Sequence, residues 1–343
     1  MSNQKWKDYF LKSGVPLEFE IKKILDKYEC FTKYDESYLR ENELNVETEF
    51  SYDINSVSIK DQNFFELMIE CKYRDKSTNW IFLPEGTKSD KRSLANNSVL
   101  HPNDYFTFEN KFHFNPFQMP YLAESCNKGI EITTHGQNPK SITQAISQLS
   151  YAMSENFLNT IIHHLESNDG CEDNIHYHIP IIVTTANLYL LNDNVTIKSI
   201  KDCDTLDEVA TKQKHLIFNC NIGKDLEDYN KKVLSKILKR FDKNFLNRRI
   251  GSEHFNNFDI FVSIVSRVLC PSNIYIVQHT EKSETLDDLF EMLKEVAYPD
   301  KTIKFIKNKE IKKHFREKKK HRNEIQTKLN NLKKNDSKDD LPF

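Results

Sequence analysis

Two strand-like segments of the sequence carry charged side chains where a buried strand ordinarily has none. The segment Phe50-Ser-Tyr-Asp53-Ile54 alternates apolar and polar residues and has Asp53 toward its end. The apolar run that begins at Phe64 continues directly into Glu70-Cys71-Lys72. Because residues i and i+2 of a strand point to the same face, we expect Glu70 and Lys72 to project together, with Cys71 on the opposite face.

Two carboxylates from adjacent strands are suited to share one divalent cation. Mg²⁺ prefers oxygen ligands and keeps several waters that a substrate phosphate can replace. We therefore expect Asp53, Glu70 and the backbone carbonyl of Cys71 to bind Mg²⁺ (or Mn²⁺), which would activate a water and polarise a phosphoryl oxygen. The ammonium group of Lys72 would orient or deprotonate that water and offset negative charge in the transition state.

The elements that would position these side chains follow from the periodicity of apolar residues. Helices are expected at 15–28, 141–165, 226–247 and 286–296, and strands within 34–59 (two), then at 64–73, 178–185, 216–221, 258–268 and 274–279. The run at 258–268 is also compatible with a buried helix, and Trp6, Tyr9 and Phe10 are expected to form a short packing helix. This order predicts an α/β (α+β layered) protein, with a central mixed sheet flanked by helices.

An Asp followed by Glu-x-Lys on an apolar strand resembles the signature of the PD-(D/E)XK nuclease superfamily. The segment Glu70-Cys71-Lys72 is similar to the form found in its Mrr-like branch, although Tyr52 stands where the signature has proline. The resemblance implies a restriction-endonuclease-like core and a Mg²⁺-dependent (endo)nuclease that hydrolyses nucleic-acid phosphodiester bonds, with DNA favoured. It also implies bacterial restriction or anti-phage defence, in which the partner is a second copy of the chain or another defence-system protein.

The resemblance further implies a Glu on the N-terminal helix and a Gln on the helix that follows the Glu-x-Lys strand. In the first helix we prefer Glu18 to Glu20, because Glu18 lies on the shoulder of the apolar stripe and precedes three aliphatic residues at the family's spacing. In the second helix Gln144 and Gln148 are one turn apart. The family's sequence context favours Gln148, whose amide would hold a phosphate or orient Lys72.

Charge is distributed unevenly along the chain. The formal net charge is −2, but residues 301–334 carry +11 and residues 335–343 carry −2, which leaves −11 for the first 300 residues. We expect three parts: a nuclease core at 1–190 with an inserted region at 74–140, a mixed α/β extension at 191–300, and a basic helical tail at 301–343 with an acidic end. The alternative function is a nuclease-fold binding or assembly module whose basic tail docks nucleic acid or a partner protein.

Composition excludes several other classes of protein. The chain has only 7 glycines and neither a GxGxxG nor a GxxxxGK[ST] motif, so dinucleotide or P-loop binding is not expected. No apolar run approaches the roughly 18 residues of a membrane span. The 7 cysteines form no CxxC pair, which predicts reduced thiols and a cytoplasmic protein. His163-His164 and His176-Tyr-His178 raise zinc as an alternative, but polar or core histidines are expected because no third ligand follows at a regular spacing.

Overall fold

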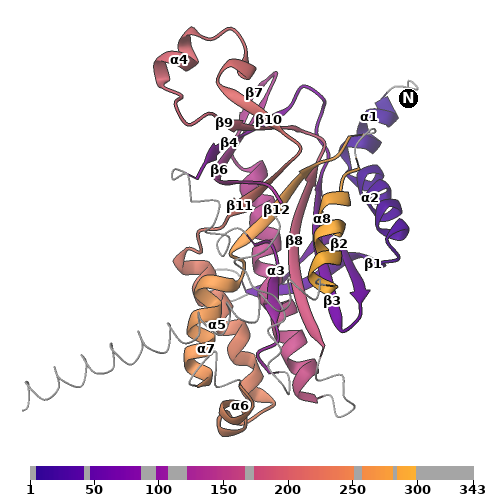
Figure 1. Ribbon diagram of the computed structural model, residues 1–343, viewed down its shortest axis with the longest axis vertical. Coiled ribbons are helices and arrows are strands. Elements are labelled where there is room, and N and C mark those ends of the chain that lie inside the picture. Colours follow the sequence, from indigo (N-terminus) through magenta and orange to yellow (C-terminus); the bar gives the residue numbers. More distant parts are fainter. Residues whose placement is uncertain are drawn as a thin grey trace, which may run out of the picture.

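The computed structural model describes residues 5–41, 47–85, 98–106, 122–166, 174–250, 257–280 and 284–298. Within these ranges the chain forms a twelve-stranded mixed sheet with helices on both faces (Figure 1). None of the helices in these ranges is long and apolar enough to cross a membrane. The basic segment 301–343, expected to be helical, lies outside the described residues.

The elements alternate irregularly between helix and strand. The helices are α1 (Lys5–Lys12), α2 (Val15–Lys27), α3 (Ser141–Glu166), α4 (Ile197–Asp202), α5 (Lys224–Ser235), α6 (Lys243–Arg249), α7 (Phe258–Ile264) and α8 (Asp287–Ala297). The strands are β1 (Phe31–Glu41), β2 (Glu47–Lys60), β3 (Asn63–Lys72), β4 (Asn79–Pro84), β5 (His101–Asn103), β6 (Glu124–Thr133), β7 (Gly136–Asn138), β8 (Ile175–Thr184), β9 (Asn187–Leu191), β10 (Ala210–Gln213), β11 (His215–Asn219) and β12 (Asn273–Gln278).

The strand that carries Glu-x-Lys lies inside the sheet. The strand order is β1-β2-β3-β8-β12-β11-β6-β4-β9-β10, with β5 beside β8 and β7 beside β6. β1, β2 and β3 form an antiparallel meander, whereas β3, β8 and β12 are parallel to one another. Because β8 is covered on both faces it is apolar along most of its length, as is usual for the parallel strands of α/β proteins.

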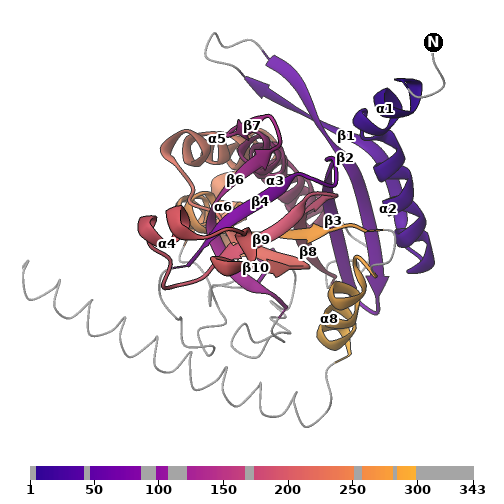
Figure 2. The ribbon, with the colours of Figure 1, turned by 90° about the horizontal axis from the view of Figure 1, so that it is seen from above.

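The helices cover two separate apolar clusters. Alternate residues of β8 contribute to the two clusters, so these lie on opposite faces of the sheet. The first, which we call the α3 cluster, packs α3, α5 and α7 against the sheet. The second, the α2 cluster, packs α2 and α8 against the other face. Figure 2 shows α2 and α8 on one side of the sheet and α3 on the other.

The prediction of a mixed α/β architecture is confirmed, but the strand expected at 258–268 is wrong. This segment forms α7 followed by a π-helical turn at Val265–Leu269. Phe258, Phe261, Val262 and Val265 are buried at helical spacing, and a short apolar run cannot be assigned by periodicity alone. The expected helix at 226–247 is interrupted, because Asp242 caps α6 by accepting hydrogen bonds from two backbone amides.

The expected insertion and the expected extension both supply strands to the sheet. The expected insertion at 74–140 contributes β4 and β6, which pair with each other. The expected extension at 191–300 contributes β12, which pairs in parallel with β8 and antiparallel with β11. Hydrogen bonding in a sheet joins strands that are distant in the sequence, and this pairing leaves no local pattern. The sheet therefore continues across the expected boundary at residue 190.

A partly buried carboxylate joins β3 to β8. Glu66 Oε1 lies 2.6 Å from Nδ1 of His176, and its Oε2 lies 3.0 Å from Nδ1 of His178. Burial would raise the pKa of Glu66, but the two imidazoles hold it well below its ordinary value. The stabilisation is therefore present above the ordinary pKa of a glutamate and is lost as the pH falls. The two histidines are thus polar residues of the core, as the sequence predicts.

We expect Glu66→Ala to destabilise the fold by about 3–5 kcal/mol, because it leaves the buried His178 and the partly buried His176 without their carboxylate. Urea unfolding at neutral pH measures this difference. The matched control is Glu166→Ala, which removes a surface ion pair with Arg240 and should cost at most about 1 kcal/mol. Equal losses in the two variants would contradict the role given to Glu66.

Candidate active site

The regular alternation of side chains between the two faces of β2 is broken at Asp53. Tyr52 belongs to the α3 cluster and Ile54 to the α2 cluster, although residues two apart share one face of a regular strand. Opposite Asp53, Asp35 of β1 has a φ of 52° in the left-handed region. Backbone pairs form on both sides of Asp35 and Asp53 but not between these two residues. Such irregularities re-aim a side chain, and this one lies where the pairing of β2 with β3 ends, at Ile54.

The pairing of β2 with β3 ends at Ile54 and Ile69, and we call the place where the two strands part, between Asp53 and the Glu-x-Lys segment, the fork. Asp53 reaches across the fork to the Glu-x-Lys segment. Its Oδ2 accepts a hydrogen bond from the backbone N–H of Cys71 at 2.6 Å. Asp53 was expected toward the end of a strand, but β2 continues to Lys60 and only its pairing with β3 changes at Asp53. Asp53 and Glu70 are still carboxylates on two adjacent strands, each next to the residue at which the pairing of β2 with β3 ends.

Glu70 is the most deeply buried acid of this group, at 1 % exposed. Its Oε1 accepts a hydrogen bond from Lys72, whereas its Oε2 has no hydrogen-bond partner although it is buried. Burial and the neighbouring charge of Asp53 raise the pKa of Glu70 to about 7, against the opposing effect of Lys72. Burial likewise raises the pKa of Asp53, although the Cys71 amide and Lys72 oppose it. Two crowded carboxylates with one buried, unsatisfied oxygen make a site that favours an added cation.

Lys72 connects the carboxylates to α3. Its Nζ bonds to Glu70 and lies 3.3 Å from Oε1 of Gln148. The other end of the Gln148 amide donates to the backbone carbonyl of Ser51 at 3.2 Å, so the side chain is held between β2 and Lys72. Gln144, one turn earlier, is exposed. The structure therefore brings Gln148 to the group and not Gln144.

The first turn of α2 brings a third carboxylate toward the fork. Leu17, Ile21 and Leu25 bury one face of α2 in the α2 cluster, and Glu18 lies beside that face. Burial, followed by the charges of Asp53 and Asp35, raises the pKa of Glu18 to about 7.

Two neighbours explain why Glu18 and not Glu20 takes this position. Gly14 precedes α2 with a φ of 88°, and a Cβ at this glycine would lie 3.2 Å from Oε1 of Glu18. A glycine here permits the positive φ and leaves room for the carboxylate. Glu20, the other candidate in this helix, instead pairs with His279 Nε2 at 2.9 Å.

Asp35 belongs to this group although the sequence analysis did not select it. Its charge raises the pKa of both Glu18 and Asp53, so it lies near both carboxylates. Its left-handed backbone at the irregularity is the kind of strained conformation that collects at functional sites. The segment Tyr34-Asp35-Glu36 carries no local signal that distinguishes it from an ordinary polar strand edge.

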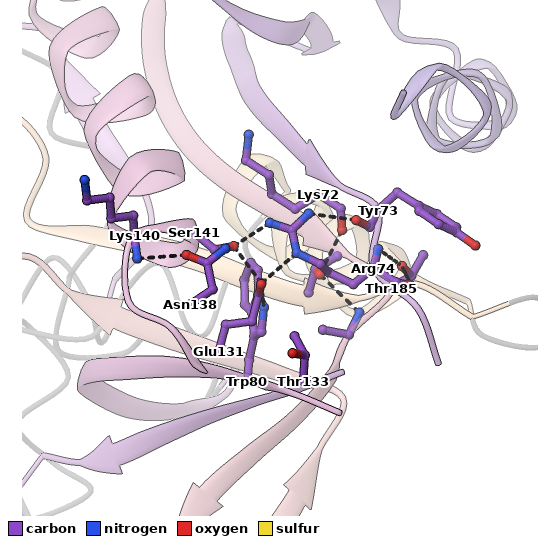
Figure 3. Close-up of polar contacts among 12 residues, drawn as sticks. Lys72, Tyr73, Arg74, Trp80, Glu131, Thr133, Asn138, Lys140, Ser141 and Thr185 are labelled. Carbon is purple, nitrogen blue, oxygen red and sulfur yellow. Dashed lines mark hydrogen bonds and ion pairs between the residues drawn. The ribbon is translucent and has the colours of Figure 1, made fainter. Parts of the chain in front are cut away.

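A second polar network fixes the chain just after Lys72 (Figure 3). Glu131 Oε2 accepts hydrogen bonds from Arg74 Nε at 2.6 Å, from Trp80 Nε1 at 2.8 Å and from Ser141 Oγ at 2.7 Å. The other guanidinium nitrogens of Arg74 donate to the Tyr73 carbonyl and to Ser141. Arg74 is therefore occupied within the protein. The network ties the end of β3 to β6 and to the first residue of α3, which carries Gln148.

The donors at the fork fit a hard divalent cation. The buried Glu70 Oε2, the carboxylate of Asp53 and a backbone carbonyl are oxygen ligands of the kind that Mg²⁺ prefers. Among the described residues no group of three or more His, Cys, Asp or Glu side chains is arranged to hold a metal ion. If Asp53 and Glu70 hold the cation, water or substrate oxygens would supply the other ligands.

Comparison of the chain with protein-family models, with curated proteins and with solved structures found no match. The case for a function therefore rests on the site itself.

Proposed function

We propose that the protein is a Mg²⁺-dependent nuclease of the PD-(D/E)XK type, which hydrolyses phosphodiester bonds of a nucleic acid, with DNA favoured. The observation that carries the proposal is Glu70: a buried carboxylate with one unsatisfied oxygen, next to Asp53 and bonded to Lys72. A protein that only binds nucleic acid has no use for buried carboxylates that repel phosphate. A metal-dependent hydrolase requires them.

In the proposed site each residue has a separate task. Asp53 and Glu70 would hold the cation together with the carbonyl of Cys71, whose N–H already points to Asp53 at the same strand edge. A cation held there would supply a more acidic water and would polarise the phosphoryl oxygen. Lys72 orients the attacking water and offsets the charge that develops on the phosphate. Gln148 holds Lys72, and Glu18 adds negative charge beside Asp53.

The arrangement of elements supports a restriction-endonuclease-like core. An N-terminal helix packs on an antiparallel meander, and the third strand carries Glu-x-Lys. After β4 to β7 the long helix α3 follows, with Gln148 bonded to Lys72 of that strand, and the next strand, β8, pairs in parallel with β3. The Glu of the first helix, the Glu-x-Lys strand and the Gln of the later helix come in the order that the resemblance implies. We extend the proposal to bacterial restriction or anti-phage defence on the resemblance alone.

The alternative function, a binding or assembly module, was expected to use the basic segment 301–343. That segment lies outside the described residues. Cleavage separates the two functions, since a binding module would shift nucleic acid in a gel without cutting it.

The direct test is cleavage of supercoiled plasmid, single-stranded circular DNA and RNA by the full chain. We expect strand scission with Mg²⁺ or Mn²⁺, none with EDTA, and none with Asp53→Ala under any condition. Asp53→Ala removes one of the two carboxylates while circular dichroism checks that the fold is retained. Cutting that survives Asp53→Ala would refute the site, and binding without cutting by the wild type on all three substrates would favour the alternative.

A further inference from the structure

The first helix leaves large aromatic side chains in solvent. Trp6, Tyr9 and Phe10 are 49 %, 70 % and 50 % exposed, and α1 has no buried residue. At positions i, i+3 and i+4 the three rings lie on one face of the helix. This helix was expected to pack on the protein, but its aromatic face is not covered by any of the residues that the structure describes. A contiguous aromatic surface of this kind is typical of an interaction site.

The charge on α1 is opposite to that of the protein as a whole. Its sequence KWKDYFLK contains three lysines, Lys5, Lys7 and Lys12, and one acid, Asp8. The first 300 residues together carry −11. A small positive aromatic surface on an acidic body is complementary to a ligand that combines negative charge with flat π-systems.

The helix that carries this surface lies beside the proposed active site. Tyr73 directly follows Lys72, and burial raises the pKa of its phenol with added effects from the charges of Asp75 and of Asp8 in α1. Asp8 is therefore close to the end of β3, and it lies on the side of α1 opposite to Trp6 and Phe10, so the aromatic rings face outward. Gly14, which has no Cβ and so leaves room for the Glu18 carboxylate, lies in the connection between α1 and α2. Figure 2 shows α1 next to α2, beside β1 and β2.

From these observations we propose that Trp6, Tyr9 and Phe10 form a stacking platform for unpaired bases, so that the substrate is single-stranded or contains an unpaired segment. The inference rests on the proposed function, because it names the substrate class of the same site. In a duplex the faces of each base are covered by its neighbours, so only unpaired bases can stack on these rings. The lysines would contact the phosphates on either side.

Another copy of the chain fits this surface less well. A symmetric pairing of two α1 helices would bring two net-positive faces together, which is unfavourable. A single strand of nucleic acid satisfies both the aromatic rings and the lysines.

Trp6 provides a direct probe, because the chain has two tryptophans and the other, Trp80, is fully buried. We expect oligothymidylate to quench Trp6 fluorescence of the full chain in EDTA. An abasic deoxyribose-phosphate oligomer of equal length and a blunt duplex should quench far less at the same concentration. Equal quenching by the abasic oligomer would show phosphate attraction without stacking and would overturn the proposal.

Affinity measured by anisotropy of a labelled oligothymidylate tests the same point without the fluorophore. The double variant Trp6→Ala/Tyr9→Ala should bind about tenfold or more weakly, since one stacked base contributes enough for that. Its dependence on salt should be unchanged, because the phosphate contacts remain. The matched control is Leu238→Ala, also an exposed apolar residue, which lies between α5 and α6 at the far end of the molecule in Figure 1.

The failure of this inference is distinguishable from the failure of the proposed function. Binding is measured without metal and does not require cleavage. Metal-dependent cutting combined with unchanged affinity of the double variant would overturn the platform and leave the nuclease intact. Stacking without any cutting would support the platform and refute the nuclease. Concentration-dependent dimerisation that is lost in the double variant would assign the surface to a second copy and overturn the proposal.

Discussion

Lys72→Ala is expected to abolish metal-dependent cleavage, with a loss on the order of 10³-fold in the single-turnover rate. The ammonium group is fixed between Glu70 and Gln148. Its removal takes away the positively charged side chain that bonds to Glu70 in this site. The variant site becomes more negative, so its affinity for Mg²⁺ should stay equal or rise. A single-turnover assay over a Mg²⁺ titration therefore separates lost chemistry from lost metal binding.

Two further variants serve as controls for the effect of Lys72→Ala. Lys76→Ala removes an exposed lysine four residues downstream and should cleave at the wild-type rate. Lys72→Arg keeps the charge, but a planar guanidinium cannot reproduce the contacts of a compact ammonium to both Glu70 and Gln148, so we expect most of the activity to be lost. Cleavage by Lys72→Ala at the wild-type rate, or a loss repaired by excess Mg²⁺, would contradict the role of Lys72 in the reaction.

The local part of the site could be predicted from the sequence because each signal is contained in one short segment. Strand alternation places Glu70 and Lys72 on one face, and Lys72 does bond to Glu70. Helical periodicity selects the shoulder position of Glu18, and its pKa responds to Asp53. Gln148 required the family resemblance as well, since periodicity alone does not distinguish it from Gln144.

The rest of the site depends on contacts between distant segments. Asp35 acts on Glu18 and Asp53 through an irregularity in β1 and β2, and aspartate enters the left-handed region without any sequence signal. Glu131 likewise gives no local signal of its partners, because Arg74, Trp80 and Ser141 come from three other segments of the chain.

The extent of the sheet also could not be predicted from local sequence patterns. β12 is an apolar strand that the sequence predicts at 274–279, but nothing in its residues shows that it lies between β8 and β11. Its position makes the second half of the chain part of the sheet that carries the site. The fold class follows from alternation and periodicity, whereas the strand order follows from tertiary packing.

The raised pKa of Glu70 predicts that metal binding and stability are coupled to pH. In the metal-free protein a carboxyl group with a pKa of about 7, against an ordinary value near 4.5, destabilises the fold as the pH rises from about 4.5 to 7. The shift corresponds to roughly 3 kcal/mol, or a fall of about 3–5 °C in Tm. Mg²⁺ binds the ionised form, so it should restore Tm at pH 8, have little effect at pH 5.5, and release protons on binding near pH 6.5.

Thermal unfolding of wild type and Glu70→Gln, with EDTA or with Mg²⁺ at pH 5.5 and 8, tests this coupling. Glu70→Gln should be more stable than wild type in EDTA at pH 8, because it removes a buried charge that is repelled by Asp53, and it should gain nothing from Mg²⁺. Asp104→Asn is the matched control: burial also raises the pKa of Asp104 to about 7, but this residue follows β5 and is not among the groups at the fork. That variant should lose part of the pH dependence and keep the whole Mg²⁺ effect. Equal stabilisation of wild type and Glu70→Gln by Mg²⁺ at pH 8 would show that the cation binds elsewhere.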